Sequence, residues 1–319
     1  MTGMGSRLTP RRIVRSARRR LGAAARRVPR KVEGVPWLVL EQKRIELRRR
    51  RTFGPTDLES LEALIRSAED VVTVRELAAM PAQARPHLLA IRHDMDHELE
   101  NSVLFAEWEA ARGVRASYYV LHTDWYWGDR PDRPTDFVLR GLARIAALGH
   151  EIGIHNNAIA AAVRHGGDPV RILADVADAL RRAGFDVTGT VAHGDPLCRA
   201  ARFINSEVFV ETPFPEYGEP DRTVVHVAES GRRSEVPLRP VPMSSLGLDY
   251  EAGYVGRIPY LSDTGGHWNA EPALIARHFG ETRDALQILA HPVWWAFSGE
   301  PIRPRPATQT PQDAIPTTR

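Results

Sequence analysis

The chain has 319 residues, of which 43% are hydrophobic and 26% charged, so it is long enough to bury a sizeable core. No apolar run approaches the ~20 residues of a membrane span, and arginines interrupt every apolar stretch near the start, so we expect neither a span nor a secretory signal. The single cysteine, Cys198, excludes an internal disulfide and fits a reducing compartment. The expectation is a soluble, cytoplasmic protein.

Charge is unevenly distributed along the chain. Residues 1–52 hold 17 Lys and Arg against three Glu, a local net charge of +14, so residues 53–319 carry −11 of the total +3. We expect residues 1–52 to form a basic, partly disordered arm in solvent. Its arginine blocks also suit a peripheral contact with an anionic membrane, and this is the alternative interpretation. Specific binding to nucleic acid is not expected.

The first predicted elements are a short helix over residues 35–51 and a capping box at Thr56-Asp57-Leu58-Glu59, followed by an edge strand over residues 71–74. From residue 88 onward, short apolar strands alternate with helices that follow polar N-cap residues and end near glycines. The predicted strands of this part cover residues 88–91, 116–121, 151–154, 187–192, 258–261 and 286–290, and the predicted helices cover residues 98–111, 136–147, 169–183 and 271–279.

This rhythm loosens between residues 196 and 256, where two further strands are predicted over residues 208–210 and 223–227. Residues 299–319 hold five prolines and many polar side chains, so they are predicted to be a disordered tail. Alternating strands and helices of this length predict parallel strands with right-handed crossovers. The expected fold class is α/β, with one domain over residues 53–298 that is most simply a β/α barrel.

Several predicted strands end in an aspartate or a histidine. In a β/α barrel the C-terminal strand ends meet at one mouth, so polar groups spread over about 200 residues would share one pocket. The residues in question are Asp94 and Asp96 after the first long strand, and His155, His193, Asp263 and His291 after later ones. These side chains are the ligand types that a divalent metal and a hydrolytic reaction need.

The two aspartates are two residues apart, so on an extended chain both carboxylates face one side while Met95 packs behind them. One is expected to bind a metal and the other to act as a base, and the alternative is that one of them caps the helix near Glu98. For each histidine the alternative to a functional role is a structural one, in which the ring is buried in the core and hydrogen-bonded to the backbone. Asp263 is interpreted as a carboxylate that orients a catalytic histidine, with a simple turn as an equal alternative.

Aromatic residues crowd the predicted strand ends. Their rings can stack on sugar faces beside a polar pocket, and they can equally fill a barrel rim or core. The residues expected to contact a substrate are Trp125, Trp268 and Trp295, together with Arg92 and His93 of the first motif.

Four ordered motifs carry a family resemblance. They are Ile91-Arg92-His93-Asp94-Met95-Asp96-His97, Gly149-His150-Glu151-Ile152-Gly153-Ile154-His155, Tyr260-Leu261-Ser262-Asp263 with Trp268, and Gln287-Ile288-Leu289-Ala290-His291-Pro292 with Trp294-Trp295. With them the chain resembles the polysaccharide deacetylases of carbohydrate esterase family 4, which share the NodB-homology domain. It is most similar to a divergent branch whose first motif reads Arg-His-Asp-x-Asp. The resemblance covers about residues 53–298.

The resemblance implies a distorted (β/α)7 barrel, a divalent metal that is often zinc, and hydrolysis of an N- or O-linked acetyl group. The implied substrate is a sugar or polysaccharide precursor, so the expected partner is a carbohydrate or glycoconjugate. By the same resemblance Asp94 corresponds to the base, Asp96 and His155 to metal ligands, and His291 to the acid.

One departure from the family pattern concerns the metal. The second family motif pairs two histidines four residues apart, but Ile159 stands at the second position here. His193 from the next strand is the expected replacement ligand, and His93 is the alternative. The missing histidine also keeps open a catalytically inactive module of the same fold that binds glycans or serves as a scaffold. A metal-dependent amidase acting on a non-sugar C–N bond is a third interpretation.

Overall fold

The computed structural model describes residues 53–81, 86–212, 219, 221–255, 258–270 and 272–297, and these residues all belong to one compact unit. The predicted basic arm over residues 1–52, with its helix over residues 35–51, lies outside the described residues. The predicted tail over residues 299–319 lies outside them as well.

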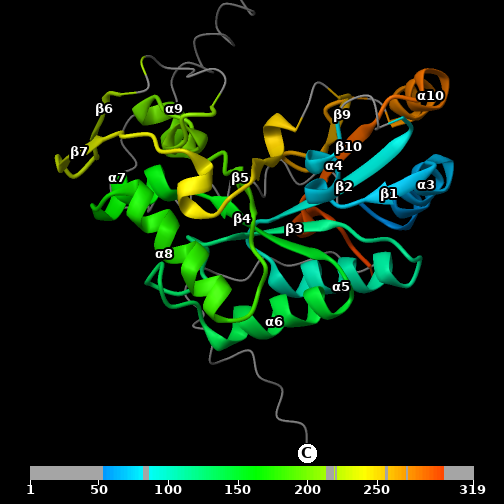
Figure 1. The fold of residues 1–319 in the computed structure, drawn as a ribbon, viewed down its shortest axis with the longest axis horizontal. Helices are drawn as coiled ribbons and strands as arrows, with labels where there is room; N and C mark the ends of the chain where they lie inside the picture. The colour runs from blue at the N-terminus through cyan, green and yellow to red at the C-terminus, as the bar shows by residue number, and fades with distance from the viewer. Residues whose placement is uncertain are drawn as a thin grey trace, which may run out of the picture. The chain divides into compact units, whose positions relative to one another are not determined.

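Within the described residues, a curled parallel sheet of eight strands forms a half-barrel at the centre of the fold (Figure 1). Neighbouring strands pair in the order β8-β5-β4-β3-β2-β10-β9, and β1 pairs with the first half of β2. The strands are β1 (Asp70–Val72), β2 (Leu88–Met95), β3 (Ser117–Leu121), β4 (Glu151–Asn156), β5 (Gly189–Ala192), β8 (Tyr250–Glu251), β9 (Tyr260–Ser262) and β10 (Leu286–Ala290). The prediction of parallel strands in an α/β fold is confirmed.

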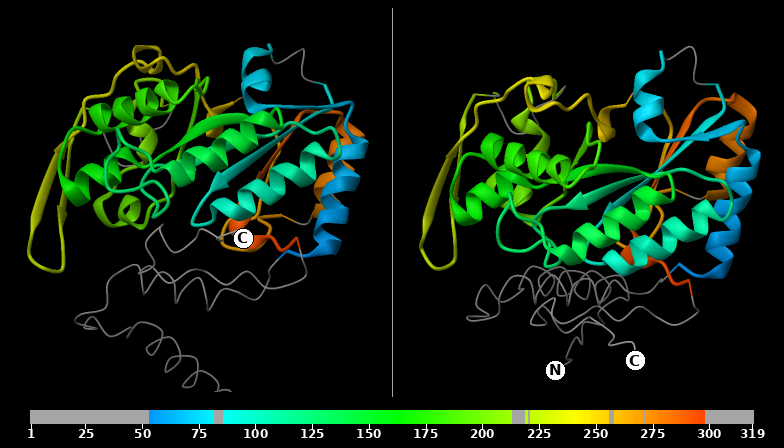
Figure 2. Two further views of the ribbon diagram at one scale, coloured as in Figure 1. Left: turned by 90° about the horizontal axis from the view of Figure 1, so that it is seen from below. Right: turned by 60° about the horizontal axis from the view of Figure 1, so that its bottom comes forward.

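Helices follow most of the strands, as parallel pairing requires. They are α3 (Pro55–Ser67), α4 (Val74–Ala79), α5 (Leu99–Ala110), α6 (Asp136–Ala147), α7 (Ala158–His165), α8 (Pro169–Arg182), α9 (Pro196–Ala201) and α10 (Pro272–Thr282). Figures 1 and 2 show α5, α6 and α8 in a row along one face of the sheet. Helices α3 and α10 lie side by side, near β1 and β10. No helix in the described part of the chain is long and apolar enough to cross a membrane.

The predicted helix boundaries of this row are confirmed where a local cap fixes them. The Thr135 hydroxyl accepts a hydrogen bond from Val138 N at the start of α6, and the Asp168 carboxylate accepts one from Val170 N at the start of α8. Gly149 and Gly184 follow the ends of α6 and α8 with φ angles of +91° and +94°. This left-handed conformation costs glycine little, so the glycines end the helices as predicted.

Two local predictions are wrong, and helix α7 was missed. Helix α3 begins at Pro55, and its first turn is capped by Asp57, whose carboxylate accepts a hydrogen bond from Gly54 N at 3.0 Å, so Thr56 is not the N-cap. The strand predicted over residues 208–210 is instead the end of the 3₁₀ turn η2 (Asn205–Val208), after which Phe209 makes only an isolated bridge. Helix α7 was not predicted, because residues 158–163 are buried on every side and show no amphipathic pattern.

Two tyrosines fill the interior of the half-barrel below the strand ends. Tyr119 and Tyr250 share a hydrogen bond of 2.8 Å between their hydroxyl groups. Room for the rings comes from two glycines, since a Cβ at Gly153 would lie 2.5 Å from the Tyr119 ring and one at Gly189 would overlap the Tyr250 ring. Gly153 shares its sheet face with His155, so these rings lie beneath the polar residues at the strand ends.

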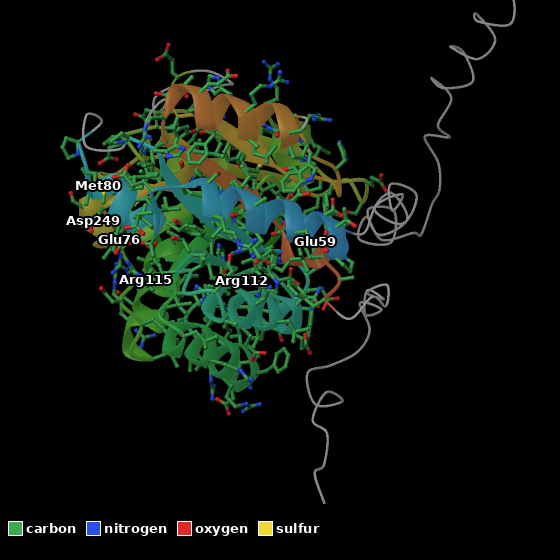
Figure 3. All side chains as sticks on the ribbon, turned by 90° about the vertical axis from the view of Figure 1, so that its right-hand side faces the viewer. Glu59, Glu76, Met80, Arg112, Arg115 and Asp249 are labelled. Atoms are coloured by element: carbon green, nitrogen blue, oxygen red, sulfur yellow. The ribbon has the colours of Figure 1, made fainter. Side chains whose placement is uncertain are left out.

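Two smaller features complete the unit. The strand predicted over residues 223–227 is confirmed as β6 (Thr223–Val227), which pairs with β7 (Arg233–Pro237) in an antiparallel hairpin outside the main sheet. On the side shown in Figure 3, Arg112 contacts Glu62 of α3 at 3.0 Å and Arg115 contacts Glu76 of α4 at 2.7 Å. Ion pairs exposed in this way contribute little to stability.

Candidate metal centre and acid–base site

The course of β2 decides where the side chains of the first motif point. This strand continues to Met95, so Asp94 still belongs to it and Asp96 follows directly. Both aspartates reach His155, at 3.7 Å from Asp94 and 3.3 Å from Asp96, whereas Met95 is fully buried in the core. The predicted geometry, with two carboxylates on one side and Met95 behind them, is confirmed.

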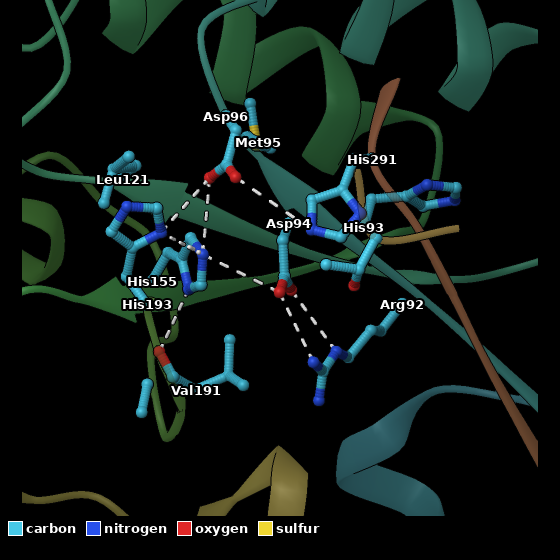
Figure 4. A network of polar contacts seen from close by, with 12 residues as sticks. Arg92, His93, Asp94, Met95, Asp96, Leu121, His155, Val191, His193 and His291 are labelled. Carbon is cyan, nitrogen blue, oxygen red and sulfur yellow. Dashed lines mark hydrogen bonds and ion pairs between the residues drawn. The ribbon is translucent and has the colours of Figure 1, made fainter. Parts of the chain in front are cut away.

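Asp96, His155 and His193 come together at the carboxyl ends of β2, β4 and β5 (Figure 4). Asp96 Oδ1 lies 3.3 Å from His155 Nε2 and 3.6 Å from His193 Nδ1, and the two nitrogens are 3.0 Å apart. Ligands bonded to a tetrahedral zinc at ~2.0–2.1 Å lie about 3.3 Å from one another. One carboxylate and two imidazoles can therefore hold a divalent ion, as was expected of these three residues.

The protons around this trio favour a cation between its members. His155 Nδ1 lies 3.1 Å from the Val191 carbonyl, to which it donates, so Nε2 is the atom that faces Asp96 and His193. Asp96 Oδ1 is buried and accepts no well-directed hydrogen bond. Because buried polar atoms usually have partners, a carboxylate oxygen and two ring nitrogens that face one another mark a place for a metal ion or a proton.

The fold also explains why the ligand expected from the family pattern at position 159 is missing. Helix α7 begins at Ala158, immediately after β4, and Ile159 is completely buried in the core. A histidine at that position would be buried among apolar side chains of the core. His193, directly after β5, supplies the imidazole instead, and its side chain remains 15% exposed at the mouth.

The charges of the trio are coupled. Burial acts to raise the pKa of Asp96, but the neighbouring His193 and His155 outweigh it and hold that pKa well below its usual range. Burial acts to lower the pKa of His155, and the carboxylates of Asp94 and Asp96 reverse this, so the pKa of His155 is raised. Burial prevails at His193, whose pKa is lowered.

Asp94 is held by Arg92 within the same strand. The two carboxylate oxygens of Asp94 each lie 3.3 Å from a guanidinium nitrogen, and the guanidinium also donates to the Tyr260 hydroxyl at 3.1 Å. Burial opposes ionisation of Asp94, but Arg92 and then His155 hold the pKa below its usual value. Asp94 is therefore a carboxylate at neutral pH. Arg92, which was expected to contact substrate, instead pairs with the predicted base.

His291 and Asp263 form a tight pair at the ends of β10 and β9. Asp263 Oδ1 accepts a hydrogen bond from His291 Nδ1 at 2.6 Å, and its carboxylate also accepts from the backbone N–H of His291 and from Trp295 Nε1. The opposite nitrogen, His291 Nε2, lies 3.9 Å from Asp96. Burial disfavours the imidazolium, but Asp263 outweighs it and raises the pKa of His291 to about 9. This geometry matches the expected orientation of a histidine by Asp263.

His93 does not belong to the pocket, so its assignment as a substrate contact and as an alternative metal ligand is wrong. It alternates with Arg92 and Asp94 along β2 and therefore points to the opposite face, against α5. The fully buried ring lies 2.8 Å from the Glu109 carboxylate and 3.2 Å from the Ala290 carbonyl. The role of His93 is to bind β2 to α5.

The tryptophans are also placed differently from the expectation. Trp295 is fully buried, stacks on Phe53 and donates to Asp263, so its assignment as a sugar-stacking ring is wrong. Trp268 packs against the same Phe53 and lines a hollow with residues of α3 and α10. Trp125 is partly exposed and donates from Nε1 to the carbonyl of His97, the residue after Asp96.

Sequence reasoning missed the polar residues that surround the ligands. Glu251, at the end of the two-residue strand β8, accepts a hydrogen bond from Ala192 N at 2.8 Å, and burial raises its pKa. Asn205, in η2, donates to the His193 carbonyl at 2.8 Å. Both lie in the stretch where the βα rhythm is lost, so no strand-end signal indicated them.

Comparisons with models of protein families, with curated proteins and with solved structures found no match to this chain.

Proposed function

We propose that this protein is a metal-dependent hydrolase that removes an acyl group, and most specifically an acetyl group, from a sugar or polysaccharide precursor. The observation that carries the proposal is the convergence of a metal-binding trio, an ionised carboxylate and an oriented imidazolium at one end of the sheet. The resemblance to polysaccharide deacetylases, with their (β/α)7 barrel, supports the same chemistry and narrows the substrate to acetylated carbohydrate.

Asp96, His155 and His193 would hold the metal, with zinc as the ion best suited to one oxygen and two nitrogen ligands. A divalent metal in such a site lowers the pKa of water toward ~7 and polarises an acyl carbonyl. His155 lies in β4, and Asp96 and His193 directly follow β2 and β5, so three strands of one sheet bring the ligands together.

Two further groups would move the protons of the reaction. Asp94, kept ionised by Arg92, accepts a proton from the attacking water as the new C–O bond forms. His291, which donates its Nδ1 proton to Asp263, gives the Nε2 proton to the leaving amine or hydroxyl as the acyl C–N or C–O bond breaks. A positioned acid or base of this kind typically contributes ~10²–10⁴-fold to the rate.

The test is to measure bound metal by elemental analysis and acetate release from N- and O-acetylated sugars. We expect His155→Ala to lose metal and activity together, and Asp94→Asn to keep the metal while turnover falls ~10²–10⁴-fold. His278→Ala, on the exposed face of α10, serves as the matched control and should change neither quantity. An unchanged rate of acetate release in Asp94→Asn, or an unchanged metal content in His155→Ala, would contradict the proposal.

A metal-dependent amidase acting on a non-sugar C–N bond is the second candidate. It is favoured by the placement of the tryptophans, because Trp295 is buried in the core and Trp268 packs on Phe53 rather than beside the metal ligands. A panel of simple N-acetyl amines assayed beside acetylated sugars distinguishes the two. Faster turnover of the simple amides would favour this candidate, and metal binding without any hydrolysis would favour an inactive binding module.

A further inference from the structure

The three histidines of the site are held in different ways. His155 is oriented through its ring, which donates to the Val191 carbonyl, and His291 is oriented through its ring by Asp263. For His193 no described residue makes a hydrogen bond to the outer ring nitrogen, Nε2. Because metal-bound histidines normally have an outer partner that fixes the ring, His193 needs another source of orientation.

Strand pairing reaches His193 only through its backbone N–H, which donates to Asn156 at the end of β4. Strand β5 ends at Ala192, one residue before His193, and its neighbour β8 is only two residues long. The next residue, Gly194, is exposed. Without further contacts, His193 would lie at the start of a loop with freedom to rotate about its backbone.

A closed circuit of hydrogen bonds removes this freedom. His193 N donates to the Asn156 carbonyl at 2.9 Å, and Asn205 Nδ2 donates to the His193 carbonyl at 2.8 Å. Asn156 Nδ2 then donates to the Asn205 carbonyl at 2.8 Å, which closes the circuit. Three segments that are far apart in the sequence therefore fix both backbone polar groups of His193.

Asn205 is the member of this circuit best suited to hold the His193 carbonyl rigidly. Its side chain is completely buried, and its side-chain carbonyl oxygen accepts from Ala160 N at 3.2 Å. Its amide nitrogen also donates to Asn157 at 3.0 Å. The other contact to the His193 carbonyl is a long one, 3.8 Å from the Cys198 sulfur. A buried amide with both ends bonded has a single orientation, so loss of its donor would leave the carbonyl nearly unpartnered.

We propose that Asn205 is a positioning residue that sets the orientation of His193 as a metal ligand. This inference rests on the proposed metal site and deepens it. It also accounts for how a histidine beyond the end of a short strand can take the place of the missing one at position 159. Asn205 lies on η2 and accepts a hydrogen bond from Ala160 N of α7. Helix α7, in which Ile159 is buried, therefore also supports His193 through Asn205.

The test is a double-mutant cycle read out by metal affinity. Dissociation constants for Zn²⁺ and Co²⁺ are measured by chelator competition for the full chain and for Asn205→Ala, His193→Ala and the double variant. We expect Asn205→Ala to weaken binding ~10–100-fold, as loss of an outer partner of a metal ligand typically does. The double variant should bind no more weakly than His193→Ala alone, because a residue that acts through His193 has no effect once His193 is gone.

Two further measurements separate positioning from a general loss of stability. The visible spectrum of bound Co²⁺ should change in Asn205→Ala. It should stay unchanged in Asn101→Ala, a control that removes another buried amide donating to two main-chain carbonyls, those of Pro292 and Trp295. Asn205→Asp, which keeps the shape and loses the donor, should reproduce the effect on affinity where the alanine variant folds poorly.

The outcomes distinguish this inference from the proposed function. Unchanged metal affinity in Asn205→Ala and Asn205→Asp, with metal lost in His193→Ala, overturns the role of Asn205 and leaves the metal site standing. Additive losses in the double variant also overturn it, because Asn205 would then act by another route. Full metal affinity in His193→Ala would remove His193 from the ligand set, and both the ligand assignment and the role of Asn205 would fall.

Discussion

At His155 a proton and a metal ion compete for the same nitrogen. The ring donates from Nδ1 to the Val191 carbonyl, so Nε2 is the atom that faces Asp96 and His193. The nearby carboxylates raise the pKa of His155 above its usual value although burial acts in the opposite direction. A metal ion must therefore displace a proton from this residue as it binds.

The first prediction at this scale is that apparent Zn²⁺ affinity increases as the pH is raised from about 6 to 8. In acid the proton on His155 excludes the metal, and it is lost as the pH rises. Calorimetry in buffers of different ionisation enthalpy should show proton release on Zn²⁺ binding. The change Asp96→Asn removes a charge that favours the proton and also a ligand, so it should weaken binding at every pH. Affinity independent of pH would contradict this account.

A second prediction concerns the pair of Asp263 and His291. The folded-state pKa of His291, about 9, lies above its ordinary value of 6.5, so the pair stabilises the fold fully below pH 6.5 and loses this contribution as the pH rises through 9. In metal-free protein, Asp263→Asn should lower the free energy of unfolding most below pH 6.5, by at most roughly 3 kcal/mol, and least above pH 9. Denaturant unfolding across this range checks the sign. A loss of stability that does not depend on pH would count against the charged pair.

A third prediction concerns Cys198. Burial raises the pKa of this thiol to about 12, so very little thiolate exists at pH 8. The folded protein should react with a thiol-specific reagent at least ~10-fold more slowly than the protein in denaturant. Absorbance at pH 8 with and without denaturant measures both rates. Equal rates would show that the thiol is not protected by the fold.

At the scale of single elements, boundaries were predictable wherever the chain carries its own local signal. Helix α6 runs over the predicted residues because Thr135 caps its start and Gly149 follows its end. Helix α7 could not be predicted, since residues 158–163 are all apolar and buried and so show no alternation of apolar and polar positions. The length of β2 was underestimated for a related reason, because Arg92, His93 and Asp94 are polar and only tertiary contacts bury them.

The prediction at this scale concerns Gly153 of β4, where the Tyr119 ring leaves no room for a side chain. A Cβ at Gly153 would lie 2.5 Å from the Tyr119 ring, so Gly153→Ala should destabilise the protein by about 1–3 kcal/mol through overpacking. Gly280, exposed within α10 and with nothing within 4 Å of an added Cβ, provides the control. Its change to Ala should stabilise by up to ~1 kcal/mol, because alanine favours the helix. Thermal unfolding of the two variants checks both signs, and a harmless Gly153→Ala would show that the tyrosines can move aside.

At the scale of the whole molecule, the site is assembled from strands that are remote in sequence and adjacent in space. Residues of β2 and β10 pair directly, as do those of β4 and β5, so the four strands bring Asp94, Asp96, His155, His193 and His291 to one edge. A metal bound there would bridge β2, β4 and β5. Metal binding is therefore expected to stabilise the entire sheet.

The prediction at this scale is that Zn²⁺ at 100 times its dissociation constant raises the free energy of unfolding by about 2.7 kcal/mol. The midpoint of thermal unfolding should rise with added Zn²⁺ and return after chelation. His193→Ala should reduce the shift, whereas Gly280→Ala should keep it. A midpoint that does not respond to Zn²⁺ or to a chelator would contradict the site.

The sequence by itself determined the α/β class, the alternation of elements from residue 88 onward and most of the acids and imidazoles at the strand ends. It could do so because strand alternation, caps and glycine stops are local properties of the chain. Tertiary structure alone decided which of the predicted site residues are buried away from the pocket and which distant segments meet. Burial turned Trp295 and His93 into core residues, and pairing of distant segments placed Asn205 behind His193. Those outcomes depend on contacts between residues tens or hundreds of positions apart, which no local pattern records.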